Sequence, residues 1–243
     1  MKMSILRFTL LMTVVCSLHS CTANDEITIM YPEPEMEKPA PKTSRYLALG
    51  DSYTIGEAVA ADQRFPVQLQ KKLAAEGVAL ASPEIIARTG WTTAELAGGI
   101  GLANPKGPYD LVTLLIGVNN QYRGLDTAEY RLQFRQLLDN AAVFAGNNYA
   151  RVIVVSIPDY GYTPFGQSRD AAKTSREIDQ FNRINYEETR KTPAEYVDIT
   201  SISRQGIVLP QLVAADGLHP SGEQYRQWVE LIAPGAKNIL GKS

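Results

Sequence analysis

Residues 46–52 read Tyr-Leu-Ala-Leu-Gly-Asp-Ser, a short apolar run that stops at Gly50 and passes straight into two polar residues. Two later stretches have a similar form. Leu111–Ile116 is apolar at five of its six positions and ends at Gly117, and Val152–Val155 is entirely β-branched. Near-continuous apolar runs of this length are typical of strands that are buried on both faces of a parallel sheet. The sequence therefore predicts at least three central strands.

Amphipathic segments separate these strands. In residues 63–76, Pro66 stands in the first turn of a helical pattern and Gly77 stands just past its end, which is the usual placement of both residue types. Similar reasoning predicts the remaining elements. They are helices starting at 92, 126 and 221, a helix over 175–190, and strands at 84–87 and 196–199.

Strands that alternate with helices indicate an α/β fold, because each crossover must place its helix against one face of a parallel sheet. We expect a three-layer α/β/α sandwich with a central parallel sheet of about five strands. Residues 45–243 contain no repeat and no second domain boundary, so they are predicted to form one domain. In sheets of this kind ligands bind beyond the carboxyl ends of the strands.

A single histidine limits the kinds of reaction that can take place at the carboxyl ends of the strands. His219 is the only histidine beyond residue 20, and Asp216 stands three residues before it. An isolated histidine is usually structural, but a carboxylate this near can bond one imidazole nitrogen and leave the other free as a base. A zinc site is not expected, because one histidine and no cysteine are available in this region. We therefore predict no metal and no cofactor.

Ser52 is the candidate nucleophile, because it follows the first strand and a serine hydroxyl needs a neighbouring base such as His219. The alternative is that Asp51 or Ser52 only caps a helix. Gly90 and Asn119 follow other predicted strands, where a backbone N–H and a side-chain amide can point at a developing oxyanion. The alternative for these two residues is that they only turn the chain.

Four sequence blocks in this order resemble those of the SGNH (GDSL-type) hydrolases. The blocks are Gly50-Asp51-Ser52, Gly90, Gly117-x-Asn119 and Asp216-x-x-His219. The resemblance spans about residues 46–240 and implies a flavodoxin-like sandwich that hydrolyses esters or thioesters without a metal. It implies these roles: Ser52 as nucleophile, His219 as base, Asp216 as the group that orients His219, and the Ser52 N–H, the Gly90 N–H and the Asn119 side chain as the oxyanion hole.

The sequence departs from the family pattern at two positions. Tyr53 stands where leucine is usual, a position that is not expected to take part in chemistry. Asn120 stands where aspartate is usual, and we expect its amide to support the loop rather than the reaction. Three aromatic residues near the same edge, Trp91, Tyr122 and Tyr160, are expected to line a substrate pocket. The alternative for them is core packing or ordinary surface exposure.

Composition excludes several classes of protein. The chain has 243 residues and a formal net charge of −2, so there is no electrostatic reason to expect nucleic acid as a partner. No apolar run reaches the roughly 18 residues that a transmembrane helix needs. Both cysteines, Cys16 and Cys21, lie near the N-terminus, so the body of the chain has no disulfide and no cysteine nucleophile. We expect a monomer.

Residues 1–20 have the form of an export signal, with Lys2 and Arg7 ahead of an apolar stretch. Leu18-His19-Ser20-Cys21 resembles a bacterial lipobox, in which Cys21 would receive a diacylglyceryl group. The alternative is an ordinary secretory signal. Residues 21–44 are acidic and proline-rich, which favours an extended tether. The expected location is the bacterial cell envelope, where Cys21 anchors the protein to the membrane.

These features lead to one main functional hypothesis, a serine esterase that acts on carboxylic esters, with acetyl or short acyl groups as candidates. Its substrate would be a small-molecule, glycan or lipid ester. Two alternatives keep the same site: an O-acyltransferase, in which a hydroxyl replaces water, and a lysophospholipase or thioesterase. A third alternative is a ligand-binding lipoprotein without catalysis.

Overall fold

The computed structural model describes residues 43–241, so the predicted signal peptide, Cys21 and nearly all of the predicted tether lie outside the described residues. Five strands form a single sheet: β1 (Tyr46–Gly50), β2 (Glu84–Ala87), β3 (Leu111–Leu115), β4 (Val152–Val155) and β5 (Glu195–Val197). Their order is β2-β1-β3-β4-β5, and every neighbouring pair is parallel. Within the described range, no helix has the length and apolarity that a membrane crossing requires.

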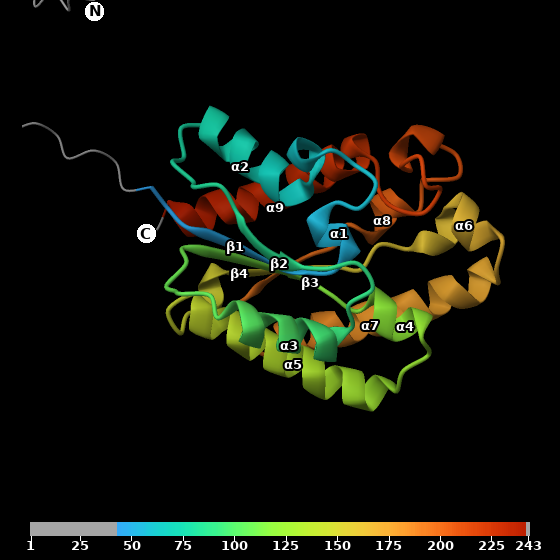
Figure 1. Ribbon diagram of the computed structural model, residues 1–243, viewed down its shortest axis with the longest axis horizontal. Coiled ribbons are helices and arrows are strands. Elements are labelled where there is room, and N and C mark those ends of the chain that lie inside the picture. Colours follow the sequence, from blue (N-terminus) through green and yellow to red (C-terminus); the bar gives the residue numbers. More distant parts are fainter. Residues whose placement is uncertain (1–42, 242–243) are drawn as a thin grey trace, which may run out of the picture. The chain divides into compact units, whose positions relative to one another are not determined.

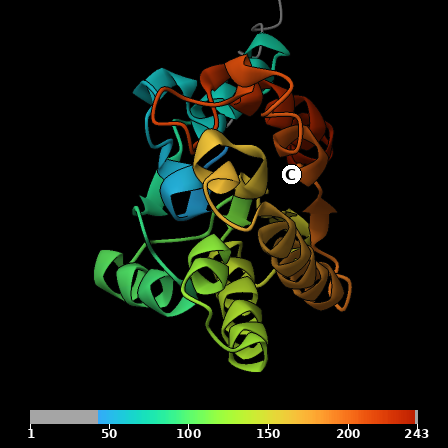
Figure 2. The ribbon, with the colours of Figure 1, turned by 90° about the vertical axis from the view of Figure 1, so that its right-hand side faces the viewer.

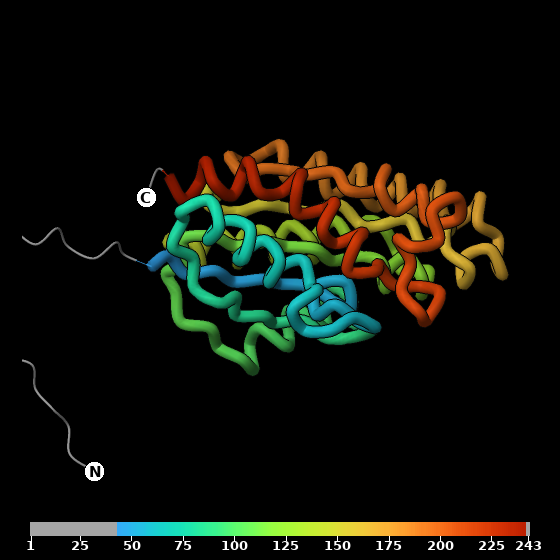
Figure 3. The backbone as a smooth tube through the Cα atoms, turned by 90° about the horizontal axis from the view of Figure 1, so that it is seen from above, coloured from blue at the N-terminus to red at the C-terminus, as the bar shows by residue number. Residues whose placement is uncertain are grey.

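Long helices cover both faces of the sheet (Figure 1). On one face lie α2 (Phe65–Ala75) and α9 (Gly222–Leu240), which run side by side (Figure 3). On the other face lie α3 (Thr93–Ala103), α5 (Thr127–Phe144) and α7 (Ala171–Thr189). The predicted three-layer α/β/α sandwich with a parallel five-stranded sheet is therefore confirmed.

Short elements complete the connections. They are the α-helices α1 (Ser52–Ile55), α4 (Val118–Tyr122), α6 (Pro164–Gln167) and α8 (Thr200–Ser203), and the 3₁₀ turns η1 (Ala61–Gln63), η2 (Tyr149–Arg151), η3 (Tyr160–Tyr162) and η4 (Pro210–Leu212). Figure 2 views the molecule from the end where α1, α4 and α6 gather, which is the carboxyl end of the strands. The sequence predicted none of these short elements, because a helix of one turn has no apolar periodicity to detect.

The core lies between the sheet and its helices. All residues of β1, β3 and β4 are buried, as continuous apolar strands require. On α9 the side chains of Tyr225, Trp228 and Ile232 are fully buried, and their spacing places them on the helix face that meets the sheet. Burial of this apolar surface is the main favourable contribution to the stability of the domain.

Some boundaries differ from the sequence prediction. Helix α7 begins at Ala171 instead of 175, because the Asp170 side chain caps it by accepting a hydrogen bond from the Lys173 N–H at 2.9 Å. Helix α2 begins at Phe65 instead of 63, since residues 61–63 form the separate turn η1. Strand β5 covers Glu195–Val197 and ends two residues before the predicted end at 199.

The order of the strands fixes where a site can form. The chain leaves β1 toward β2 on one side and later returns to place β3 on the other side. At such a switch point the loops after the two strands separate and leave a crevice at the carboxyl end of the sheet. Ser52 follows β1 and Asn119 follows β3, so both stand at the edges of this crevice.

Gly50 permits the sharp turn that carries the chain from β1 into α1. A Cβ atom at this position would lie 2.5 Å from the backbone oxygen of Leu115 on the neighbouring strand and would also overlap the Thr54 side chain. The backbone oxygen cannot move without disturbing β3. Only glycine allows α1 to approach the sheet this closely.

We therefore expect Gly50→Ala to lower the free energy of unfolding by about 1–3 kcal/mol, the usual cost of forcing an extra carbon into a packed core. Gly98 provides a matched control, because it lies in the exposed part of α3 and its added Cβ would meet nothing within 4 Å. Gly98→Ala should stabilise the protein by about 0.5–1 kcal/mol, since alanine restricts the unfolded chain. Urea unfolding of both variants tests this expectation, and a Gly50→Ala protein as stable as the wild type would contradict it.

Candidate active site

Ser52 is positioned by the turn that starts α1. Asp51 is the residue before the helix, and its Oδ1 accepts a hydrogen bond from the Tyr53 N–H at 3.0 Å. Gly56 ends the helix in a left-handed conformation with φ of 69°. The capping function that sequence analysis considered for this pair is therefore carried by Asp51. The hydroxyl of Ser52 remains available to another partner.

Asp51 has a second unusual property, because its side chain is completely buried. Burial raises the pKa of its carboxyl to about 7, against the opposing effect of backbone N–H donors such as that of Tyr53. Its Oδ2 has no hydrogen-bond partner among the described residues. A carboxyl held this way supports the start of α1 and does not contact the imidazole of His219.

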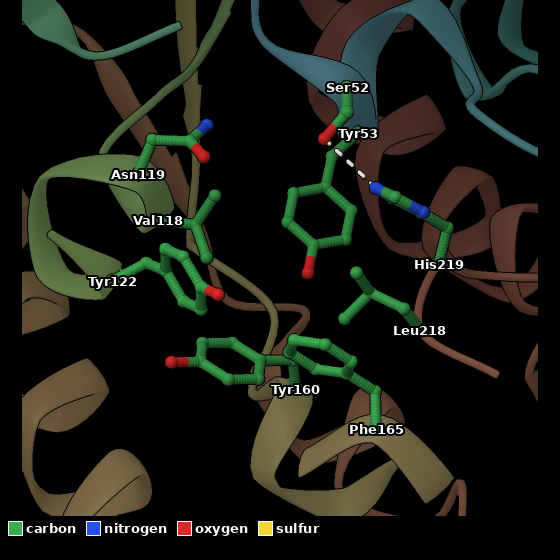
Figure 4. Close-up of a pocket in the computed structure, with 9 residues that line it drawn as sticks. All are labelled: Ser52, Tyr53, Val118, Asn119, Tyr122, Tyr160, Phe165, Leu218 and His219. Carbon is green, nitrogen blue, oxygen red and sulfur yellow. Dashed lines mark hydrogen bonds between the residues drawn. The ribbon is translucent and has the colours of Figure 1, made fainter. Parts of the chain in front are cut away.

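The loop before α9 brings the histidine to the serine. Asp216 Oδ1 accepts hydrogen bonds from the N–H groups of Leu218 and His219, both at 3.0 Å, which closes a tight turn. Asp216 Oδ2 lies 2.6 Å from Nδ1 of the imidazole. On the opposite edge of the ring, Nε2 lies 3.0 Å from Ser52 Oγ (Figure 4). The structure thus brings together three predicted residues, two of which are 167 positions apart.

The surroundings of Asp216 keep its carboxyl ionised. Partial burial alone would raise the pKa of the Asp216 carboxyl, but the hydrogen bonds from the imidazole and from two backbone N–H groups outweigh it and hold that pKa below its ordinary value. Asp216 is therefore an anion at neutral pH. An anion at Nδ1 keeps a proton on that nitrogen and leaves Nε2 able to accept one from Ser52.

Asn119 lies across the pocket from Ser52 (Figure 4). It belongs to α4, which follows β3 through Gly117, a residue with φ of 131°. Nδ2 of Asn119 donates a hydrogen bond to the Trp91 carbonyl at 3.0 Å. A primary amide has two N–H groups, so this bond fixes the orientation of the side chain and leaves a second donor.

The loop that contains Gly90 is also held by α4 and the residue after it. Asn120 Oδ1 accepts a hydrogen bond from the Thr93 N–H at 3.0 Å, and Asn120 Nδ2 donates to Thr93 Oγ1 at 2.8 Å. Arg123 Nη2 donates to the Gly90 carbonyl at 2.6 Å and forms an ion pair with Glu95. Gly90 itself has φ of 82°, a conformation that glycine adopts without strain. Asn120 thus joins α4 to the first residue of α3, just after the loop that contains Gly90.

A cavity of about 230 Å³ opens beside Ser52 and His219. Most of its wall is aromatic or aliphatic, and it is lined by Ser52, Tyr53, Val118, Asn119, Tyr122, Tyr160, Phe165, Leu218 and His219 (Figure 4). Apolar cavities with a few converging polar groups are the usual form of a small-molecule site. This arrangement can hold an apolar group directly against the serine hydroxyl.

Of the three aromatic residues predicted for the pocket, Tyr122 and Tyr160 line the cavity, but Trp91 does not. The Trp91 indole packs beside Gly99 of α3, where the absence of a side chain leaves room for it. The Trp91 backbone carbonyl accepts a hydrogen bond from the pocket residue Asn119. Gly90 also lies outside the lining of the cavity.

Four residues that line the cavity were not predicted from the sequence to do so: Tyr53, Val118, Phe165 and Leu218. Three of them directly adjoin Ser52, Asn119 or His219 in the chain, and this adjacency was the signal that could have found them. Phe165 lies on the short helix α6 and had no such signal. Residues 43–241 contain no group of three or more histidine, cysteine, aspartate or glutamate side chains arranged to hold a metal ion.

Comparisons with known proteins show what this chain resembles in fold and in sequence. The chain covers almost the full length of several solved structures at low sequence identity. For TesA the identity is 19%, the coverage is 81% of this chain and 99% of that chain, and the TM-score is 0.65. For the psychrotrophic esterase EstA from Pseudoalteromonas sp. the identity is 17%, the coverage is 82% of this chain and 99% of that chain, and the TM-score is 0.59. These similarities establish a shared fold.

A third solved structure is a variant of Axe2, an acetyl-xylooligosaccharide esterase from Geobacillus, with 19% identity, coverage of 82% of this chain and 94% of that chain, and a TM-score of 0.59. No curated protein matches the chain by sequence. The sequence profile of the GDSL-like Lipase/Acylhydrolase family matches residues 48–227, which is most of the chain and includes every residue of the site. The chain therefore belongs to the GDSL-like lipase/acylhydrolase family of hydrolases.

Proposed function

We propose that this protein is a serine esterase that cleaves carboxylic esters through an acyl-enzyme. The observation that carries the proposal is the continuous chain of contacts from Asp216 Oδ2 to His219 Nδ1 at 2.6 Å and from His219 Nε2 to Ser52 Oγ at 3.0 Å. A serine whose hydroxyl meets an imidazole, itself oriented by a carboxylate, is the arrangement that activates this nucleophile. Membership of a hydrolase family supports the same reaction class.

In the first half of the reaction, Ser52 Oγ attacks the ester carbonyl while His219 Nε2 takes its proton. The carbonyl oxygen becomes an oxyanion, and the Asn119 amide and the Ser52 N–H donate to it. The Gly90 N–H, which lies outside the lining of the cavity, is the third donor that the family resemblance implies. The imidazolium then protonates the alcohol oxygen as the C–O bond breaks, so the alcohol leaves and an acyl group remains on Ser52. Asp216 stabilises the imidazolium throughout this step.

In the second half, water enters and His219 Nε2 removes one of its protons as the water oxygen attacks the acyl carbonyl. The same donors stabilise the second oxyanion, and the imidazolium returns the proton to Ser52 Oγ as the acid departs. The largely apolar cavity beside Ser52 supports an ester whose apolar part lies against Tyr122, Tyr160 and Phe165. Similar proteins offer chemical support, because the EstA structure was determined inhibited by monoethylphosphonate and Axe2 is an acetyl-xylooligosaccharide esterase.

We expect Ser52→Ala to lower kcat for a p-nitrophenyl ester by at least about 10⁴-fold, since removal of the serine from such a triad costs up to about 10⁶-fold. The thermal unfolding curve should stay close to that of the wild type, because the change removes only the small hydroxyl that bonds His219 and leaves the Asp51 cap of α1 in place. Ser201→Ala, at an exposed serine of α8, is the matched control and should keep wild-type turnover. A folded Ser52→Ala enzyme with activity within about tenfold of wild type would overturn the assignment of the nucleophile.

Asn119 and Asn120 allow catalysis to be separated from support of the loop. Asn119→Ala should lower kcat by about 10²- to 10³-fold with little change in KM, because its donor acts on charge that develops only in the transition state. Asn120→Ala should instead lower the free energy of unfolding by about 1–3 kcal/mol, because it leaves the buried Thr93 N–H without its partner. Steady-state kinetics and urea unfolding of both variants test whether the two residues have these different roles. If the two variants behave alike, Asn119 has no special role in the reaction.

We also propose that the protein is attached to the bacterial cell envelope through lipid on Cys21, on the basis of the lipobox-like residues before it. Cys21→Ala should move the protein from the membrane fraction to the soluble fraction or prevent its maturation, because the attached acyl chains supply the membrane affinity. Growth with labelled fatty acid gives the direct readout. Wild-type protein that carries no label would contradict the proposal.

A further inference from the structure

The end of the cavity opposite Ser52 is closed by three aromatic rings, which we call the ring wall: Tyr122 of α4, Tyr160 of η3 and Phe165 of α6 (Figure 4). The ring centroids are 6.2 Å apart for Tyr122 and Tyr160, 6.2 Å for Tyr160 and Phe165, and 6.3 Å for Tyr122 and Phe165. These separations are typical of favourable aromatic contacts. The wall therefore joins three elements that are distant in the chain.

Arg169 covers the ring wall and is not among the residues that line the cavity. Its guanidinium carbon lies 4.9 Å from the ring centroid of Tyr122 and 4.9 Å from that of Phe165. Nη2 of Arg169 donates a hydrogen bond to the Tyr122 hydroxyl at 2.8 Å. Tyr122 is 46% exposed, so packing alone holds it weakly. The contacts with Arg169 hold this ring in place at the end of the cavity.

A second cavity of about 240 Å³ lies beyond the ring wall. Tyr122 and Tyr160 line both cavities, so these two side chains form the partition between them. The second cavity is polar and is lined by Gln121, Tyr122, Gly124, Tyr160, Arg169, Asp170, Lys173, Thr174 and Glu177. An apolar chain that reached the partition would have to displace an aromatic ring and then enter charged surroundings.

We propose that Arg169 is a positioning residue that fixes Tyr122 as the end wall of the acyl pocket and thereby sets the longest acyl group that the enzyme accepts. The inference rests on the proposed esterase function and concerns the substrate class of the same site. The acyl group is assigned to this cavity because it stays bonded to Ser52 through both half-reactions, whereas the alcohol must leave before water attacks. A cavity with a closed end suits the group that stays.

The volume of the cavity gives the expected limit. A protein cavity of about 150 Å³ holds benzene, which has six carbons, so a cavity of about 230 Å³ corresponds to an acyl group of about nine carbons. Each methylene that the pocket buries should raise kcat/KM by up to about fourfold, and the rise should stop when the pocket is full. The substrate class is therefore esters of short and medium-chain acids.

The test is a chain-length profile of kcat/KM for p-nitrophenyl esters from acetyl to hexadecanoyl, with soluble protein that lacks the first 20 residues. In the wild type the profile should peak at about nine carbons or below. Arg169→Ala and Tyr122→Ala should each raise the ratio of dodecanoyl to hexanoyl turnover by at least about fivefold, because an opened wall lets two or more further methylenes be buried. Tyr122→Phe keeps the ring but loses the hydroxyl that Arg169 binds, so its profile should lie between those of the wild type and Tyr122→Ala.

A second arginine–tyrosine pair provides the matched control. Arg190 lies over the Tyr186 ring at 5.6 Å and its Nη1 donates to the Tyr186 hydroxyl at 3.3 Å, and neither residue lines the cavity. Arg190→Ala should therefore keep the wild-type profile. Thermal unfolding of every variant identifies any that fail to fold, and Arg169→Ala should fold normally because Arg169 is exposed.

The outcomes separate the two proposals. If the wild type hydrolyses these esters but neither Arg169→Ala nor Tyr122→Ala changes the ratio, the ring wall does not set the limit and the inference is wrong. If the ratio changes instead across a series of acetate esters of lengthening alcohols, the cavity holds the alcohol and the acyl assignment is wrong. If the folded wild type cleaves no ester at all, the proposed function itself fails.

Discussion

The hydrogen bond between His219 Nε2 and Ser52 Oγ is the contact on which the account of this protein depends. It joins the first strand's carboxyl end to a loop just before the last helix, across 167 positions of sequence, at 3.0 Å. Both partners are fixed locally. Ser52 lies at the helix start that Asp51 caps, and the loop of His219 is held by two backbone N–H groups that donate to the Asp216 carboxylate. The proposed reaction requires the two side chains to be held within about half an ångström of their working geometry, so this local fixation matters as much as the pair itself.

The sheet positions the other residues of the site. Strand β1 lies between β2 and β3, and the crevice at their carboxyl ends receives a polar loop from each strand. Asn119 and Asn120 lie side by side on α4 but contact different groups, the Trp91 carbonyl and Thr93 respectively. The first side chain lines the pocket and the second bonds the first residue of α3. The same short helix thus both contributes to the pocket wall and holds the start of the neighbouring helix.

The sequence predicts the fold well for those elements that have a strong periodic or apolar pattern. The runs that became β1, β3 and β4 were recognisable because buried parallel strands exclude polar residues. The positions of Ser52, Asn119 and His219 followed from the ends of elements and from a family resemblance. Trp91 was misplaced, because adjacency to Gly90 does not reveal that its ring turns toward Gly99. Phe165 and Arg169 were not found, since the ring wall depends on the packing of short helices that have no pattern in sequence.

The central claim is that Ser52 is the activated nucleophile, and covalent labelling tests it most directly. The wild-type protein is treated with a fluorophosphonate probe, and the modified peptide is located by mass spectrometry. The account predicts one adduct per chain on Ser52, because His219 Nε2 lies 3.0 Å from the Ser52 hydroxyl and can accept its proton. A protein that hydrolyses esters while Ser52 stays unlabelled, or that carries the adduct at another serine, would contradict the account.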